Sequence, residues 1–133
     1  MALRVLHLRH PDVQWHEPPI RADFTDDRIA DLAIAGVSPE RLVVALIIGP
    51  VDGGSRTIAL SWNVGGEGLD AACARNARLV VEELELPPEM DARRSLEAKA
   101  ARSRGVKGLK LEVPPCDVFH LYWDPPGGIS WWR

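Results

Sequence analysis

The chain has 133 residues, of which 46% are hydrophobic and 26% charged, and 16 basic residues against 19 acidic ones give a formal net charge of −3. This size and composition exclude an intrinsically disordered protein and predict one globular domain over residues 1–133 that folds without metals or disulfides. The longest apolar run, Leu42–Ile48, is far too short to span a membrane, and charged residues interrupt the first twelve positions where a signal peptide has its apolar core, so we expect a cytoplasmic protein without membrane contact.

The N-terminal third predicts a strand, a proline-rich connection and a helix. Residues 3–8 are short and apolar on both alternating faces, a pattern typical of a strand inside a sheet. Prolines then interrupt regular structure until about residue 22. A helix is expected from Asp23 or Thr25, either of which can cap it, to Gly36, which ends it.

A β-hairpin is expected in the middle of the chain. Leu42–Ile48 is apolar on both faces, Thr57–Val64 alternates between apolar and small or polar residues, and the glycine-rich stretch between them favours a turn. Because successive strand residues point to opposite faces, we predict that Trp62 enters the core and that Ser61 and Asn63 face away from it.

The C-terminal half predicts two helices and a second hairpin. Apolar residues recur at helical spacing over residues 69–85, and a stretch rich in alanine and arginine over residues 89–104 predicts a helix on the surface. Residues 117–123 and 129–133 are expected to form strands joined by a proline–glycine turn at residues 125–128.

The predicted order is strand, helix, strand, strand, helix, helix, strand, strand. Apart from the second consecutive helix and the last strand, this is the split βαβ order of a ferredoxin-like domain, which is an antiparallel sheet with helices on one face. We therefore predict an α+β fold of the ferredoxin-like type, with an extra helix and a C-terminal β-hairpin.

One face of such a sheet has no helix to cover it. The residues predicted on that face are Val43, Ala45, Ile47, Ala59, Ser61, Val118, His120 and Tyr122. This set is too apolar for free contact with water, so we expect a partner, a second copy of the chain or the proline-rich loops to cover it.

Tryptophan is concentrated near the C-terminus. Trp131 and Trp132 are adjacent, and neighbours on a strand point to opposite faces, so both cannot enter one core. Together with Trp123 and Arg133 they predict a contact surface for a protein partner, because tryptophan and arginine are preferred interface anchors. The alternative is that this hairpin only seals a small core.

The leading functional hypothesis is a small bacterial regulator, adaptor or inhibitor that binds a protein partner of unknown identity. Thirteen arginines against three lysines indicate a GC-rich bacterial gene. The alternative from another class is an enzyme in which two sheets of a homodimer enclose a ligand. Its catalytic candidates are His120 and Tyr122, with Ser61 and Asn63 as further polar groups of the cavity.

Basic residues are concentrated between Arg93 and Lys110, where seven of them accompany one acidic residue. The third hypothesis is therefore a nucleic-acid binder. Its contact residues would be Arg93, Arg94, Lys99, Arg102 and Arg104. The alternative is that this segment is solvated or pairs with the chain's own acidic segments at residues 23–31 and 82–91.

No cofactor and no metal site is predicted. A glycine-rich segment at residues 66–71 matches the spacing of dinucleotide-binding turns, but its acidic residues place negative charge where a pyrophosphate binds. His7 and His10 face opposite sides of the predicted strand and cannot easily ligate one ion together. Cys73 and Cys116 are expected to be reduced, buried thiols.

Overall fold

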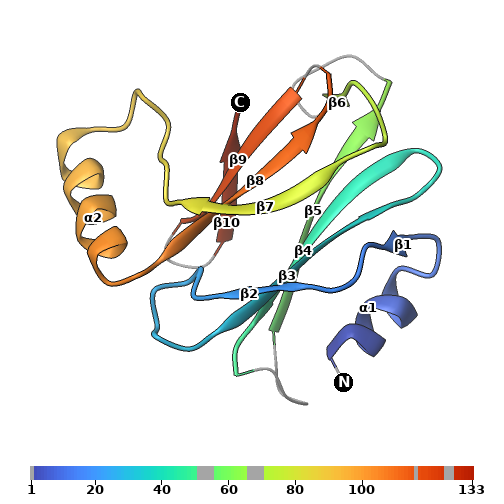
Figure 1. The fold of residues 1–133 in the computed structure, drawn as a ribbon, viewed down its shortest axis with the longest axis horizontal. Coiled ribbons are helices and arrows are strands. Elements are labelled where there is room, and N and C mark those ends of the chain that lie inside the picture. The colour runs from blue at the N-terminus through green and yellow to red at the C-terminus, as the bar shows by residue number, and fades with distance from the viewer. Residues whose placement is uncertain (1, 51–55, 66–70, 116, 125–127) are drawn as a thin grey trace.

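The computed structural model describes residues 2–50, 56–65, 71–115, 117–124 and 128–133 as a mixed α+β structure in which strands dominate. Sheet A contains β1 (Gln14–Trp15), β2 (Ile20–Ala22), β3 (Asp31–Val37), β4 (Arg41–Ile48), β5 (Arg56–Val64) and β6 (Ala71–Ala72). Sheet B contains β7 (Arg78–Glu83), β8 (Lys107–Val113), β9 (Asp117–Asp124) and β10 (Gly128–Trp132). The helices are α1 (Ala2–Arg9) and α2 (Ala92–Ser103) (Figure 1). Neither helix has the length and apolar character needed to cross a membrane.

The two sheets have different connectivity. Sheet A has the order β1-β3-β4-β5-β6, with β2 also paired to β3, and sheet B has the order β10-β9-β8-β7. The pairs are antiparallel except β5 with β6, which is parallel. Strands β1 and β2 pair with opposite ends of β3, and residues 16–19 separate them.

Strand β4 lies at the centre of sheet A and is buried on both faces. Each of its residues from Leu42 to Ile47 is at most 2% exposed. Alternate residues of a strand point to opposite sides of the sheet. Both sides of sheet A therefore need an apolar layer against them.

Sheet B supplies the layer on one side. The Trp62 ring of β5 stacks on the Phe119 ring of β9 with their centroids 5.1 Å apart, and the Trp131 ring of β10 contacts both edge-on. Leu109 and Leu111 of β8 belong to the same buried cluster. Aromatic pairs in these geometries add to the stabilisation that comes from buried area. This cluster joins the two sheets through one core.

The N-terminal segment of the chain covers the other side of sheet A. Leu6 of α1 is 1% exposed and packs with Val13 and Trp15 over the sheet. The covered residues are Ile34, Val43, Ala45 and Ile47. A Cβ atom at Gly36 of β3 would lie 2.5 Å from Val13 Cγ1 and 2.8 Å from Trp15 Cε3, so only glycine allows this close approach.

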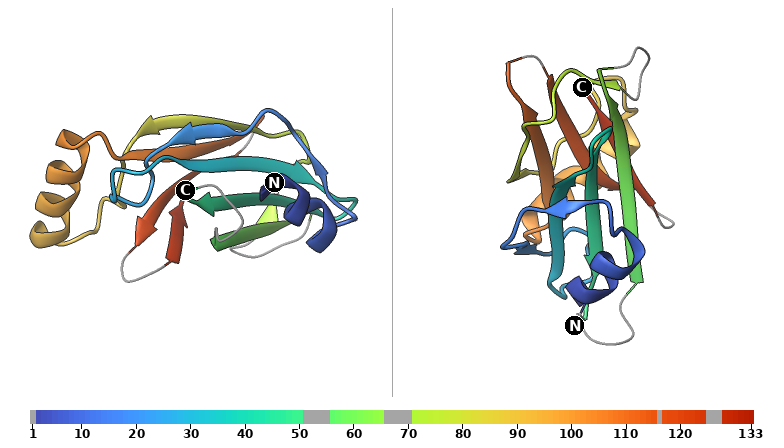
Figure 2. Two further views of the ribbon diagram at one scale, coloured as in Figure 1. Left: turned by 90° about the horizontal axis from the view of Figure 1, so that it is seen from below. Right: turned by 90° about the vertical axis from the view of Figure 1, so that its right-hand side faces the viewer.

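Helix α2 covers one end of the outer face of sheet B. Tyr122 of β9 is buried there with Leu84, Val106 and the α2 residues Ala98 and Ala101. Figure 2 shows α2 at one end of the sheets, whereas α1 lies near the other end. The two helices also cover different sheets, because α1 packs against sheet A and α2 packs against sheet B.

Several predicted elements are confirmed. Leu42–Ile48 and Thr57–Val64 pair as β4 and β5, with Trp62 buried and with Ser61 and Asn63 exposed. The predicted surface helix is α2, and the last two predicted strands pair as β9 and β10. Strand alternation and the helix-favouring composition of residues 89–104 are local signals, and these elements follow them.

The first predicted strand is wrong. Residues 3–8 lie in α1, where Leu3 and Leu6 are one turn apart and pack on the same side against sheet A. A spacing of three residues brings side chains together on a helix. In so short an apolar run, strand and helix patterns are difficult to distinguish.

Two predicted helices are also wrong. The helix expected to end at Gly36 is replaced by a turn and by β3, because the Asp23 side chain bends the chain by binding backbone N–H groups of the following residues. Within the helix expected over residues 69–85, residues 78–83 form β7, whose run of leucine and valine favours a strand.

The α+β class is confirmed, whereas the ferredoxin-like arrangement is not, because the described strands form two sheets and the two helices do not lie on one face. The predicted elements include residues that lie outside the described part of the chain. These are residues 51–55 between β4 and β5, most of the glycine-rich segment at 66–71, Cys116 and the turn residues 125–127.

Helix α1 offers a matched test of this packing. Leu6→Ala should lower the free energy of unfolding by about 2 kcal/mol or more, because it removes a buried side chain and leaves a space between α1 and sheet A. Leu8→Ala on the same helix should change it by less than about 0.5 kcal/mol, because Leu8 is 74% exposed. Urea unfolding followed by circular dichroism measures both, and equal losses would contradict the orientation of α1.

Candidate ligand-binding site

A cavity of about 380 Å³ lies between α2 and the adjacent end of the sheets. We call it the α2 cavity. Its apolar lining comes from Phe24, Leu84, Leu86, Ala98, Ala100, Ala101, Val106 and Trp123, and its charged lining from Asp26, Arg94, Glu97 and Arg104. This volume and this mixture of an apolar wall with a few polar groups are typical of small-molecule sites.

Helix α2 forms the first wall. The Asp91 side chain caps the helix by accepting the Arg94 backbone N–H at 2.9 Å. Ala98 and Ala101 are three residues apart, so they lie on the same face of the helix, and both are buried against the sheet side. Because alanine side chains end at Cβ, this face leaves a space between the helix and the sheets.

The segment after β7 forms the second wall. It passes close over Gly108 of β8, where a Cβ atom would lie 3.3 Å from both Leu84 Cα and the Leu121 carbonyl oxygen. The missing side chain at Gly108 therefore lets the chain turn across the outer face of sheet B. This turn buries Leu84 and brings Leu86 to the cavity.

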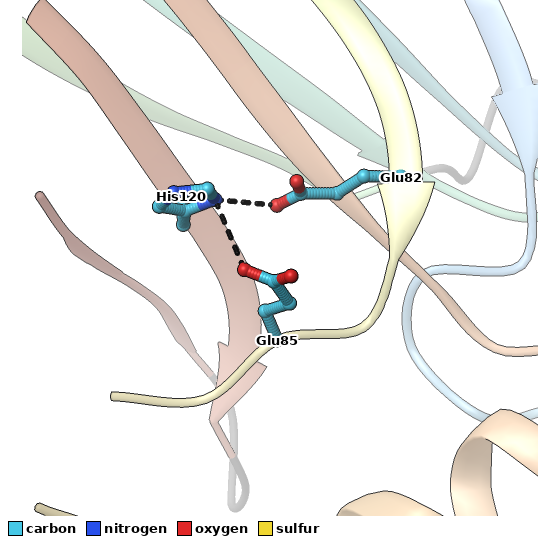
Figure 3. A group of neighbouring side chains, drawn as sticks. All are labelled: Glu82, Glu85 and His120. Atoms are coloured by element: carbon cyan, nitrogen blue, oxygen red, sulfur yellow. Dashed lines mark hydrogen bonds and ion pairs between the residues drawn. The ribbon is translucent and has the colours of Figure 1, made fainter. Parts of the chain in front are cut away.

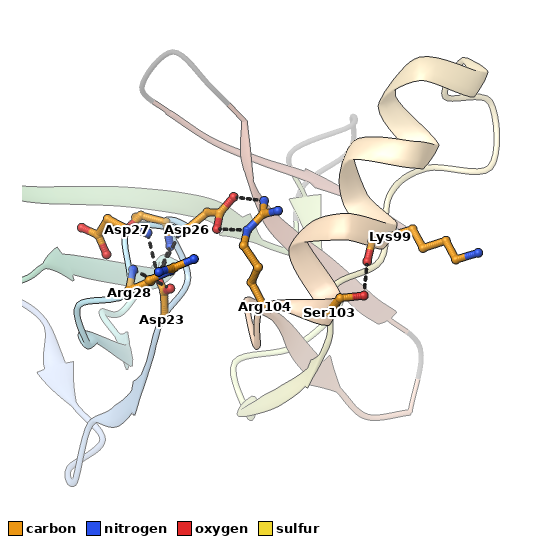
Figure 4. Close-up of polar contacts among 8 residues, drawn as sticks. Asp23, Asp26, Asp27, Arg28, Lys99, Ser103 and Arg104 are labelled. Carbon is orange, nitrogen blue, oxygen red and sulfur yellow. Dashed lines mark hydrogen bonds and ion pairs between the residues drawn. The ribbon is translucent and has the colours of Figure 1, made fainter.

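The loop between β2 and β3 forms the third wall, and Asp23 fixes its first turns. Asp23 Oδ1 accepts the Asp26 N–H at 2.9 Å, and Oδ2 accepts the Arg28 N–H at 3.0 Å (Figure 4). Asp26 and Arg28 both have positive φ, at 63° and 65°. The side-chain hydrogen bonds of Asp23 hold these less favourable backbone conformations in place.

Asp31 fixes the end of the same loop. Its side chain is fully buried, and it accepts the N–H groups of Phe24 at 2.9 Å and Gly49 at 2.8 Å and the Thr25 hydroxyl at 3.2 Å. A buried carboxylate needs such donors to offset its desolvation. Asp31 therefore holds Phe24, a wall residue of the cavity, against the end of β4.

Arg104 connects α2 to this loop. Its Nε donates to Asp26 Oδ1 at 3.0 Å, and its Nη2 donates to Asp26 Oδ2, so the pair is bidentate (Figure 4). The hydrogen bond from Arg104 lowers the pKa of Asp26 below its ordinary value, and the same bond raises the pKa of Arg104. The pair closes one side of the cavity and neutralises two of its four charged groups.

Arg94 is the remaining basic group of the cavity. Its Nη2 donates to Asp124 Oδ1 at 2.8 Å, while its Nε lies 3.9 Å from Glu97 Oε2. Nε is buried and has no hydrogen-bond partner among the described residues. The cavity lining thus carries two arginines and two acids, and its net charge is zero.

Most of the basic residues predicted to contact nucleic acid bind groups within the molecule. The contacts are Arg93 with Glu97, Arg94 with Asp124, Arg102 with the Leu84 carbonyl oxygen, and Arg104 with Asp26. Lys99 projects from α2 (Figure 4). The Arg104 and Arg102 contacts favour the alternative in which this segment faces the chain's own residues 23–31 and 82–91.

The predicted contact surface at the C-terminal hairpin is largely used inside the molecule. Trp131 lies against Trp62 and Phe119 in the core, whereas Trp132 lies on the opposite face of β10, as strand alternation requires. The Arg133 guanidinium lies 4.9 Å from the centre of the Phe119 ring and donates to the Ala71 carbonyl oxygen. Trp123 lines the α2 cavity.

The four polar residues of the enzyme hypothesis are divided between the two sheets. His120 and Tyr122 lie on the outer face of sheet B, where His120 contacts Glu82 and Tyr122 is buried beside α2. Ser61 and Asn63 are exposed on the outer face of sheet A. Neither catalytic candidate lines the α2 cavity.

Cys73 is exposed and disulfide-bonded, which corrects the expectation of a reduced, buried thiol at this position. The expectation followed from the small number of cysteines, and a cysteine count alone does not determine whether a given thiol is oxidised.

Comparisons with known proteins identify no relative of the chain. No protein-family model, curated protein or solved structure matches the chain. The α2 cavity and its lining residues therefore carry the functional inference.

Asp31 should be essential for the cavity wall. Asp31→Ala should lower the free energy of unfolding by at least about 2 kcal/mol, because buried donors lose their acceptor. Asp27→Asn is the matched control: Asp27 is exposed, and asparagine keeps the oxygen that accepts the Ile29 N–H, so a change within about 0.5 kcal/mol is expected. Chemical denaturation distinguishes the two, and a neutral Asp31→Ala variant would refute the role of this carboxylate.

The Asp26–Arg104 pair should give stability a pH dependence. Because the pKa of Asp26 is lower in the folded chain than its ordinary value of 3.8, the contribution is fully present above that value and is lost as the pH falls through the lower, folded-state pKa. Wild type and Asp26→Asn should therefore differ in unfolding free energy at neutral pH and converge in acid. A difference that grows as the pH falls would contradict the assignment.

Proposed function

We propose that the protein is a binding protein for a small, largely apolar molecule held in the α2 cavity. The observation that carries this proposal is the cavity itself, a space of about 380 Å³ whose walls are mainly apolar and whose charged residues sum to zero. Burial of apolar ligand surface against such walls is the main source of affinity in small-molecule sites.

The lining indicates the chemistry of the ligand. Phe24 and Trp123 bring aromatic rings to the lining, and an aromatic or cyclic ligand packs well against such rings. The arginines favour a hydrogen-bond acceptor on the ligand, but Arg104 already has Asp26 and Arg94 already has Asp124. A neutral molecule with at most one acceptor group therefore fits this lining better than a charged one.

Binding is favoured over catalysis by the state of the polar groups. The charged side chains of the cavity are engaged with one another or with Asp124. A general acid or base has to reach a proton of the substrate, and a group held in an ion pair is poorly placed for that. The catalytic candidates His120 and Tyr122 lie elsewhere.

We rank the hypothesis of a protein partner below the proposal of a small-molecule ligand. Trp131 and Arg133 are occupied by the core and by the Ala71 carbonyl oxygen, and Trp132 lies against His120. Fewer side chains of the hairpin are therefore available to contact a partner than its number of tryptophans indicates. A partner that inserts an apolar side chain would use the same α2 cavity.

Binding of Nile red, a neutral apolar fluorescent dye, tests the proposal directly. Wild type should bind one dye per chain with an increase in dye fluorescence. Ala100→Trp should weaken binding at least about tenfold, because Ala100 lines the cavity from an exposed helix position and the larger ring fills the space.

Ala92→Trp is the matched control, because Ala92 is exposed on the same helix and does not line the cavity. Its dye affinity should equal that of wild type. Equal affinities for both variants would place the dye outside the cavity and refute the proposal. If wild type binds no dye, a small-molecule role is refuted and the partner hypothesis gains weight.

A further inference from the structure

A second group of side chains meets on the outer face of sheet B, apart from the α2 cavity. His120 Nδ1 lies 2.8 Å from Glu82 Oε2 and 3.6 Å from Glu85 Oε2 (Figure 3). One donor atom from each of the three side chains lies within 4.8 Å of the other two. An imidazole nitrogen and two carboxylate oxygens are all ligands of divalent first-row metals.

The spacing of these atoms suits a single ion. A tetrahedral zinc site holds nitrogen and oxygen ligands at about 2.0 to 2.2 Å from the metal, which separates the ligand atoms from one another by about 3.4 Å. The two distances from His120 Nδ1 lie on either side of this value. The Glu85 side chain is 53% exposed and therefore has room to adjust.

The charge of the group favours a dication. Two carboxylates share one imidazole, so the group stays negative whether or not the ring is protonated. Among the described residues, no lysine or arginine lies within ion-pairing distance of Glu82 or Glu85. Lys110 lies opposite His120 in the β8–β9 pair, but its ammonium group pairs with Glu112 at 3.6 Å.

Trp132 holds the group in position. Its ring stacks on the His120 ring with centroids 4.4 Å apart and 26° between the planes. Its Nε1 donates to the Glu85 backbone carbonyl oxygen at 3.2 Å. One indole therefore fixes both an imidazole and the segment that carries a carboxylate, and such preorganisation reduces the entropy lost when an ion binds.

We propose that Glu82, Glu85 and His120 bind a Zn²⁺ ion through three protein ligands, with a fourth coordination position open to water. The imidazole nitrogen favours zinc over Mg²⁺ or Ca²⁺, which prefer sites made only of oxygen. The ion connects the end of β7 to β9, and Trp132 acts as a positioning residue that extends this connection to β10. The proposal does not depend on the α2 cavity.

A second acidic group found among the described residues is built differently. Asp23, Asp27 and Asp31 also lie close together, but their oxygens accept backbone N–H groups of the β2–β3 loop and of Gly49. Those bonds account for the group as a support of the loop. We propose no ion for this group, which serves as a comparison with the group of Glu82, Glu85 and His120.

Isothermal titration calorimetry of the full chain, free of affinity tags, with zinc chloride tests the proposal. Wild type should bind one Zn²⁺ per chain at this site. Glu85→Gln should weaken it at least about tenfold, because a neutral amide is a poor zinc ligand and Glu85 is exposed enough for the fold to tolerate the change. His120→Gln should have the same effect.

Glu83→Gln is the matched control. Glu83 neighbours Glu82 but faces the other side of β7 and pairs with Lys107 at 2.9 Å, so zinc affinity should stay unchanged. Trp132→Phe keeps a stacking ring but loses the bond to Glu85, and it should weaken zinc binding about tenfold without loss of the fold. Zinc binding that survives both Glu85→Gln and His120→Gln, or its absence in wild type, would overturn the proposal.

Discussion

The burial of β4 on both faces is the constraint on which the rest of the structure depends. A strand that is apolar on both faces is stable only between two further layers, because either face left in water would forfeit the free energy of burying its side chains. Sheet B provides one layer through the Trp62, Phe119 and Trp131 cluster, and the segment from α1 to Trp15 provides the other. The apolar face expected to need a partner is thus covered, at β4, from within the chain.

The positions of the two candidate sites follow from which surfaces of sheet B this arrangement leaves uncovered. The core buries the inner face of sheet B, so only its outer face and its end near α2 can hold a binding site. There the chain after β7 turns over Gly108, and this one turn brings Leu84 and Leu86 to the α2 cavity and Glu85 to His120. A side chain at position 108 would disturb the apolar cavity and the polar group together.

Local patterns in the sequence were sufficient to predict part of the fold but very little of the two candidate sites. The β4–β5 pair, α2 and the β9–β10 pair could be predicted because strand alternation, turn residues and helix-favouring composition act within a few residues. The helix at residues 3–8 could not, since a short apolar run suits either element and tertiary contacts with sheet A select one. His120 could be singled out from the sequence, but its partners Glu82 and Glu85 are 38 and 35 positions away and meet it only through the β7–β8–β9 register.

The division of the outermost strand of sheet A into β1 and β2 has a consequence for association between molecules. An unpaired strand edge is a template on which another chain can add a strand, and long regular edges promote aggregation. Here the edge is two short pieces separated by residues 16–19, which include Pro18 and Pro19, and proline has no N–H to donate. A strand of another molecule therefore cannot form a continuous row of backbone hydrogen bonds along this edge of sheet A. This arrangement opposes aggregation by β-strand addition on that side.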